Sequence, residues 1–397
     1  MKQQGFFQVL LVIVILTACG QLTNTIYVPV MSDMAKDLNV TSSNIQAVMA
    51  LYLISYGFSQ FIYGPLSDHY GRKPIILIGL VIFIAGSAMS GIAHTLPLLL
   101  TGSFIQGMGT GVGGVMSRTV MRDMYSGANL QRANSFVSMI VVFTPLIAPA
   151  LGSWISSEML WNGCFWFLMI FGIATWALVF THFNETHKPT PEHRMNPIAS
   201  YRLVLGMGQF NRFTIMLVVT ISGIVLFEAS AGILMVDVLH LPTGLVSLLF
   251  ILPLPGYLAG SWLAARMAKK HSLERILLIG ILLLGLGSMM MVIGGISHYL
   301  SSMAILIPAF VYFAGAGLVF PTATTAALEP LPNNAGVAGA VLGGVQNLGS
   351  GLITLAASTM PMHNQLPLGV ALTMLTVIVV FMFCLHMAPS AKMPMAH

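Results

Sequence analysis

Charged residues are scarce in this 397-residue chain, at 7% of the total, whereas hydrophobic residues make up 56%. An ordinary soluble domain carries about 25% charged residues, and it needs them to cover its surface. Most of this surface must therefore face lipid. The alternating ten-residue pattern of an outer-membrane barrel is also absent, so the sequence predicts an all-α integral membrane protein.

Cysteines and catalytic motifs are equally sparse. The three cysteines all fall within apolar runs, which excludes a disulfide framework and a CxxC metal site. No Walker motif, Ser/His/Asp spacing or histidine ligand pattern occurs, so we expect no enzyme, no metal and no nucleotide. The glycines at 109, 111 and 114 match a dinucleotide fingerprint on paper. They lie in an apolar run without a preceding strand, where glycine instead lets helices pack closely.

Apolar runs long enough to cross a bilayer, which takes about 20 residues, are abundant. The first six cover residues 6–31, 44–66, 75–95, 97–121, 133–155 and 160–183. The second six cover residues 213–236, 244–267, 274–297, 300–326, 335–359 and 366–387. The sequence therefore predicts twelve transmembrane helices in two sets of six.

A single long hydrophilic stretch, residues 184–212, separates the two sets and contains prolines and charges of both signs, which is typical of a linker. We divide the chain into an N-terminal six-helix bundle (1–184), a cytoplasmic linker (185–211), a C-terminal six-helix bundle (212–388) and a cytoplasmic tail (389–397). Paired six-helix halves are common in secondary transporters, whose binding site lies between the halves.

The net charge of +5 does not indicate a nucleic-acid partner, because the basic residues follow topology. With the N-terminus in the cytoplasm, all but two of the 16 Lys and Arg residues fall in cytoplasmic segments. This is the positive-inside pattern, and it places both termini in the cytoplasm. Lys36 lies outside, and Arg118 falls within a span.

The start of the chain, through Leu16-Thr17-Ala18-Cys19, resembles a bacterial lipoprotein signal. However, the basic region has one lysine, and apolar sequence continues beyond Cys19 to a length that spans a bilayer. We therefore interpret this stretch as the first transmembrane helix.

The strongest local motif, GPLSDHYGRKP, joins the second and third spans. Its pattern resembles the cytoplasmic signature of the major facilitator superfamily, Gly-x-Leu-x-Asp-x-x-Gly-Arg-Lys. A glycine at 71 permits a tight turn, and Asp68 can pair with Arg72 or cap a helix. In that family the loop holds the two halves together on the cytoplasmic side and releases as the protein opens inward. The resemblance implies a gating set of Gly64, Asp68, Gly71, Arg72, Lys73, Arg122 and Asp123.

The fifth span contains TPLIAPALGSWI, which is similar to the superfamily's antiporter motif. Proline and small residues bend a helix and let it pack closely. The motif implies proton-coupled export and not uptake. The matching positions are Thr144, Ala148, Pro149, Gly152 and Ser153.

The end of the first span, TIYVPVMSDMAKDLNV, resembles the Bcr/CflA group of drug:proton antiporters, and the whole chain looks most like the EmrD-type multidrug transporters. The resemblance implies two pseudo-symmetric bundles around a central cavity in the bacterial inner membrane. This chain departs from the pattern at two positions. Thr25 replaces a frequent aspartate, and Ser103 replaces the arginine that usually precedes Gln106-Gly107. Proton coupling must therefore use other groups.

Glu228 is the one carboxylate that the sequence places deep within a span. A charge there costs about 2.5–3.5 kcal/mol on insertion scales, so it usually marks function. We expect Glu228 to carry the proton, to pair with a cationic substrate, or both; the alternative is a protonated structural glutamate. Asp33 is a second proton-coupling candidate. Arg118 either anchors an anionic group at the bundle interface or extends to the cytoplasmic surface.

Polar and aromatic residues of the spans are candidates for the substrate cavity, because aromatic rings and the 28 methionines suit varied apolar molecules. Such residues at helical spacing also occur in ordinary helix packing. The candidates are Gln21, Asn24, Tyr52, Tyr56, Arg118, Phe227, Glu228, Phe250, Tyr257, Tyr312, Phe313, Gln346 and Asn347.

Together these features predict a proton-driven exporter of amphipathic compounds that works by alternating access as a monomer, with protons as the coupling ion and no other cofactor. Its partners are small amphipathic molecules and the lipid bilayer, with no nucleic acid or nucleotide. The alternative is an exporter of one natural metabolite, such as a sugar, an amino acid or a lipid-like solute. A passive channel needs neither the gating loop nor the antiporter motif.

Overall fold

The computed structural model describes residues 6–125, 127–186, 197–297, 299–331, 335–360 and 362–387, and the regular structure in these ranges is helical. The predicted tail, residues 389–397, lies outside them. The first half contains α1 (Phe6–Thr25), α2 (Met31–Asp37), α3 (Ser42–Tyr70), α4 (Arg72–Gly91), α5 (Leu96–Met124), α6 (Gly127–Met159) and α7 (Asn162–His182). The remainder contains α8 (Pro197–Leu205), α9 (Gly208–Ile233), α10 (Thr243–Leu249), α11 (Leu254–Met267), α12 (Leu273–Ile296), α13 (Ser302–Leu328), α14 (Ala335–Ala357) and α15 (Leu366–Met387).

The predicted many-span architecture is confirmed by ten stretches of the described chain that are long and apolar enough to cross a membrane. The other two predicted spans correspond to α5 and α6, whose 29 and 33 residues exceed the length that a crossing needs. Twelve crossings therefore stay a prediction. Cys19 is buried in α1, where its sulfur lies 3.5 Å from the hydroxyl of Thr175 in α7, so the first predicted span is part of the helical packing.

Two predicted spans are not continuous helices. Span 6–31 ends its α-helix at Thr25 and continues through a 3₁₀ turn, η1 (Val28–Val30), into α2. Span 244–267 is divided into α10 and α11. Both breaks contain proline, Pro29 in the first and Pro253 in the second, and proline lacks the N–H that the helix would use. The seventh span also ends in a π-helical segment, η3 (Leu234–Val238).

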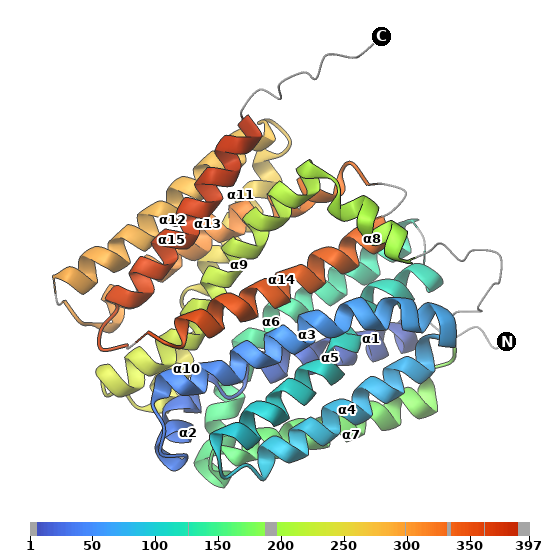
Figure 1. Cartoon of the computed structure of the whole chain (residues 1–397), viewed down its shortest axis with the longest axis horizontal. Helices are drawn as coiled ribbons and strands as arrows, with labels where there is room; N and C mark the ends of the chain where they lie inside the picture. The colour runs from blue at the N-terminus through green and yellow to red at the C-terminus, as the bar shows by residue number, and fades with distance from the viewer. Residues whose placement is uncertain are drawn as a thin grey trace.

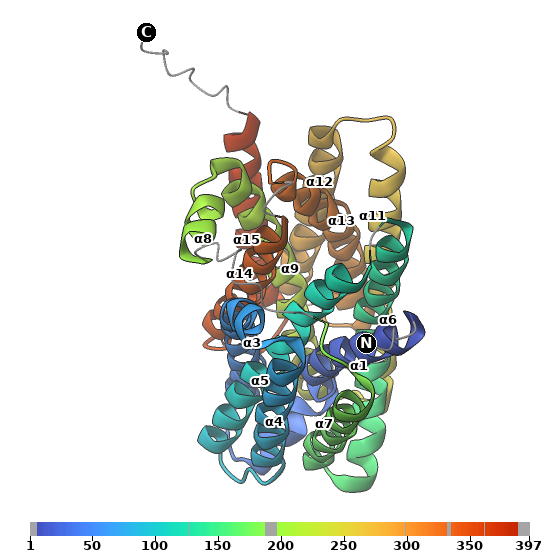
Figure 2. The same cartoon turned by 90° about the vertical axis from the view of Figure 1, so that its right-hand side faces the viewer.

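Two hydrophobic cores underlie the fold. One is built from residues between Val9 and Phe183, joined by Val225 and Ala229 of α9, and the other from residues between Val204 and Val379. Figures 1 and 2 show the corresponding helical bundles lying side by side, with α14 of the second bundle along α3 of the first. The exact boundaries of the two domains stay a prediction.

The seam between α3 and α14 depends on glycine. A Cβ added at Gly57 of α3 would lie 2.6 Å from the carbonyl oxygen of Gly344, and one added at Gly351 of α14 would lie 2.7 Å from the backbone nitrogen of Ile54. Small residues allow two membrane helices to approach until their backbones touch. The two bundles therefore meet here with little side-chain material between them.

We expect Gly57→Ala to destabilise the protein, because the added methyl group overpacks a tight contact at a cost of about 1–3 kcal/mol. Gly285→Ala is the matched control, since a Cβ at this position of α12 meets nothing within 4 Å. Thermal unfolding in detergent should show a lower midpoint for Gly57→Ala alone. Equal midpoints for the two variants would contradict the close seam.

Candidate functional site

A pocket of about 400 Å³, including its open mouth, lies between the two bundles. The first bundle contributes one residue from α1, one from η1 and two from α6, and the second contributes residues from α9, α11, α13 and the turn after α10. The lining residues are Thr25, Val28, Pro145, Pro149, Phe227, Glu228, Phe250, Leu254 and Phe313.

Glu228 is the one ionisable side chain among the pocket-lining residues. It lies on α9, between the buried side chains of Phe227 and Ala229, and is itself half-buried. Among the described residues no hydrogen bond or ion pair reaches its carboxylate. The carboxyl group is therefore available to a proton or to a molecule that occupies the pocket.

Aromatic rings form much of the remaining wall. Phe227 and Phe313 meet edge to face, with ring centroids 5.5 Å apart and an interplanar angle of 80°. Phe250 packs against the cores of both bundles. The only other polar lining side chain is Thr25, whose hydroxyl donates to the carbonyl of Gln21 at 3.1 Å. The pocket thus combines one acid with an apolar, aromatic surface.

Several predicted cavity residues lie away from the pocket lining. The Tyr52 hydroxyl is buried in the first bundle, where it donates to Gly20 O at 2.8 Å and accepts from Thr110 at 3.0 Å. Its ring lies 5.8 Å from that of Tyr56. Tyr312 is 1% exposed in the core of the second bundle, where a Cβ added at Gly223 of α9 would overlap its hydroxyl. The side chains of Tyr52 and Tyr312 are therefore each packed inside one bundle, away from the pocket.

The other predicted polar residues are half-buried on their helices, and none is among the pocket-lining residues. The Asn347 amide donates to Gly343 O within α14 at 2.9 Å, and Tyr257 packs against the core of the second bundle. The side-chain oxygen Oδ1 of Asn24 is buried without a hydrogen-bond partner in the described structure. Gln21 and Gln346 complete the group.

The two remaining charged candidates lie elsewhere. Arg118 of α5 crosses to the second bundle, where its Nη1 donates to the carbonyl of Gly339 in α14 at 2.7 Å. It therefore joins the bundles. Asp33 lies on α2 with 45% of its side chain exposed, and its nearest cation is Lys36 at 3.7 Å.

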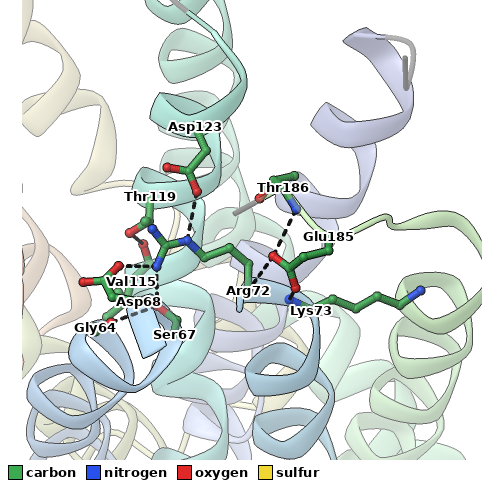
Figure 3. Close-up of polar contacts among 10 residues, drawn as sticks. All are labelled: Gly64, Ser67, Asp68, Arg72, Lys73, Val115, Thr119, Asp123, Glu185 and Thr186. Atoms are coloured by element: carbon green, nitrogen blue, oxygen red, sulfur yellow. Dashed lines mark hydrogen bonds and ion pairs between the residues drawn. The ribbon is translucent and has the colours of Figure 1, made fainter. Parts of the chain in front are cut away.

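A cluster of charges surrounds Arg72 at the start of α4 (Figure 3). Arg72 is 3% exposed, and its guanidinium group donates to Asp123 of α5 through Nε at 2.9 Å. Its Nη1 bonds Asp68 and also Ser67 Oγ, the latter at 2.7 Å. Three of the predicted gating residues are therefore in direct contact. Asp123 was expected as a partner because it follows Arg122 at the end of the fourth span.

Glu185, which follows α7, is a member of this cluster that the sequence did not reveal. Its carboxylate accepts hydrogen bonds from the backbone N–H groups of Arg72 at 2.8 Å and Lys73 at 3.0 Å, so it caps α4 (Figure 3). Gly71 has φ = 95°, and a Cβ there would lie 2.6 Å from the Glu185 carboxylate. The glycine of the motif is thus required by both conformation and space.

The predicted antiporter motif lies on α6 where this helix contacts α1 and the pocket. Pro149 lines the pocket, whereas Thr144 and Ala148 are buried and Ser153 is half-buried. A Cβ at Gly152 would overlap the carbonyl group of Ile26. The small residue therefore allows α6 to approach the point where the first span breaks.

Comparison with known proteins agrees with this architecture. The family model described as Major Facilitator Superfamily matches residues 13–354. Over 386 residues the chain is 39% identical to "Multidrug resistance protein D" of Escherichia coli, covering 96% of each chain. Over 372 residues it is 24% identical to "Bicyclomycin resistance protein homolog" of Haemophilus influenzae, covering 92% of this chain and 93% of the relative. The xylose transporter XylE of E. coli, in a partially occluded inward-open conformation, has the same fold, with a TM-score of 0.74 at 15% identity over 96% of this chain and 97% of that one.

Two helical bundles around a central pocket, with a charged loop at one end, define a class of multi-pass membrane proteins. The chain belongs to the major facilitator superfamily. This confirms the resemblance that the motif between the second and third spans carries, and the two relatives confirm the likeness to the Bcr/CflA drug transporters.

We expect Arg72→Lys to impair gating, because an ammonium group cannot contact Asp68, Asp123 and Ser67 at once as the guanidinium fork does. Transport by membrane vesicles should fall about tenfold, equivalent to about 1.4 kcal/mol, with the protein still inserted. The control is Arg266→Lys, since Arg266 lies over the Trp262 ring and away from this cluster. Equal transport by both variants would contradict the assignment.

Proposed function

We propose that this chain is a proton-driven multidrug efflux antiporter that exports amphipathic and hydrophobic compounds across the bacterial inner membrane by alternating access. The names of two relatives refer to drug resistance. The family fold provides two halves that can rock about a central site. The proposal depends most on one observation, the carboxyl group of Glu228 in an otherwise apolar pocket.

Glu228 links the proton to the substrate. When the pocket opens outward, the carboxyl group takes a proton from the outside, and when the pocket opens inward it releases that proton to the cytoplasm. An incoming compound occupies the same pocket and favours release of the proton, because drug and proton compete for one carboxylate. Among the residues that the structure describes, no other ionisable group lines the pocket, so one site serves both partners.

The pocket chemistry favours amphipathic compounds over polar metabolites. Glu228 and Thr25 are the only polar side chains among its described lining residues, and the hydroxyl of Thr25 already donates to the Gln21 carbonyl. A sugar or amino acid that left water for this wall would lose hydrogen bonds without replacement. Phe227, Phe250 and Phe313 instead offer flat apolar surfaces that accept molecules of varied shape.

The remaining features of the proposal follow from topology. The basic residues Arg72, Arg266, Lys269 and Lys270 support a cytoplasmic location for the loops that carry them and for both termini. The Arg72 cluster then closes the cytoplasmic side. One chain supplies both walls of the pocket, so we propose that the monomer is the working unit, with protons as the coupling ion and no other cofactor.

The decisive test uses everted membrane vesicles with an acidified interior and a pH-sensitive dye. Addition of a lipophilic cation should provoke proton efflux from vesicles with the wild-type protein but not with Glu228→Gln, which keeps the size of the side chain and removes its charge. Glu274→Gln is the matched control, because Glu274 lies at the start of α12 beside His386 and away from the pocket.

Proton efflux in wild type and Glu274→Gln alone would establish antiport and assign its carboxylate. An equal response in all three proteins would move the proton to another group. No response to lipophilic cations, detergents or neutral amphiphiles would overturn the multidrug proposal.

A further inference from the structure

The eighth span is divided between the two bundles. Its second part, α11, is fixed to α13 by close backbone contacts, since a Cβ at Gly256 or Gly260 would overlap the carbonyl of Phe310 or Ala314 respectively. Its first part, α10, contacts α6 and η1 of the first bundle as well as η3. A short segment of the second bundle therefore rests on the first (Figure 1).

The turn between α10 and α11 has the bonding of a hinge. The last α-helical bond of α10 runs from Phe250 N to Val246 O at 3.0 Å. Ile251 and Leu252 then donate three residues back, each at 3.1 Å, in tighter 3₁₀ turns. Pro253 and Pro255 have no N–H to donate, so the α-helical ladder cannot continue through this stretch. Leu254 and Gly256 also donate three residues back, at 3.3 Å and 3.0 Å, so the α-helical ladder is interrupted from Ile251 to Gly256 and can bend there.

Phe250 occupies this hinge and also lines the pocket. It packs against the cores of both bundles. The Cβ position of Gly232 lies 3.7 Å from the tip of the Phe250 ring and 2.9 Å from the carbonyl of Val28, so the ring lies close to the contact between α9 and η1. One side chain therefore touches the pocket, the hinge and the opposite bundle.

Polar contacts at this end also join α3 to the second bundle. Ser42 donates to Asp237 of η3, Ser43 donates to Met360 O at 3.2 Å, and the Gln46 amide lies 3.4 Å from Ala229 O. These bonds hold the two bundles together at the end of α3 opposite the Arg72 cluster. The side covered by α10 is held mainly by apolar packing around Phe250, which a molecule in the pocket can displace.

Building on the proposed function, we propose that α10 is a lid over the outer mouth of the pocket, that it swings at residues 250–256, and that Phe250 is the specificity-determining residue through which the substrate moves it. A bulky molecule that enters from the inside presses on the Phe250 ring and lifts α10 from α6 and η1. A molecule too small to reach the ring leaves the lid closed. The lid therefore selects cargo by size.

The test measures how readily the pocket is reached from outside. Thr25→Cys places a thiol on the pocket wall, and Cys384→Ser removes the exposed native thiol, while Cys19 and Cys164 stay buried. De-energised intact cells are labelled with a membrane-impermeant maleimide. Adding Phe250→Ala should speed labelling about tenfold, because loss of the ring shifts the lid toward its open population.

Phe320→Ala is the matched control. It removes a partly buried phenylalanine ring from the same bundle, but Phe320 lies on α13, outside both the pocket lining and the hinge. Its labelling rate should equal that of the parent. The double variant Pro253→Ala/Pro255→Ala tests the hinge with the Phe250 ring intact. A continuous helix would make α10 follow α11 and leave α6, so labelling should again rise.

Cargo selection is tested with tetraphenylphosphonium and the smaller tetramethylammonium. Tetraphenylphosphonium should speed labelling of the parent, whereas tetramethylammonium should not, and Phe250→Ala should abolish the difference. The lid proposal is overturned if the parent, Phe250→Ala and the double proline variant are all labelled at the same rate. This holds whatever proton efflux from the vesicles shows about Glu228. Labelling as expected without proton efflux would instead overturn the antiport proposal and leave the lid in place.

Discussion

The cost of placing charge in hydrocarbon constrains this structure more than any other single effect. Arg72 is buried only because two carboxylates and a hydroxyl surround its guanidinium group. Glu228 has no such partners among the described residues and lies instead on a pocket wall. The two sites hold scarce charge in different ways, because Arg72 is paired within the protein whereas Glu228 faces a pocket.

The sequence predicted the fold and the charged cluster because these depend on patterns that lipid enforces. Apolar runs and the distribution of basic residues leave few alternatives to a bundle of membrane helices. Asp68 and Arg72 lie four residues apart in a specific motif, so their contact was predictable. Glu185 was not, because it is separated from Arg72 by four helices and acts through the backbone.

The pocket was predicted only in part for a physical reason. Apolar side chains in a membrane protein face lipid, core or pocket with the same chemistry, so Val28, Pro145 and Leu254 carry no local signal. Tyr312 was expected in the cavity, yet its side chain is buried in the second core. Glu228 was predictable because its charge has so few tolerable environments. The prolines at 253 and 255 indicate that the helix of span 244–267 is interrupted, although the length of this apolar run suggests one continuous helix.

The glycine seam between α3 and α14 restricts how the two bundles can move. Gly57 lies against the backbone of Gly344 and Leu348, while Gly344 and Gly351 receive the side chains of Phe61 and Ile54. Sliding one helix along the other would bring larger residues against these positions, because only a small residue lets the backbones approach so closely. The seam therefore favours a change of angle between α3 and α14 over a shift along their length.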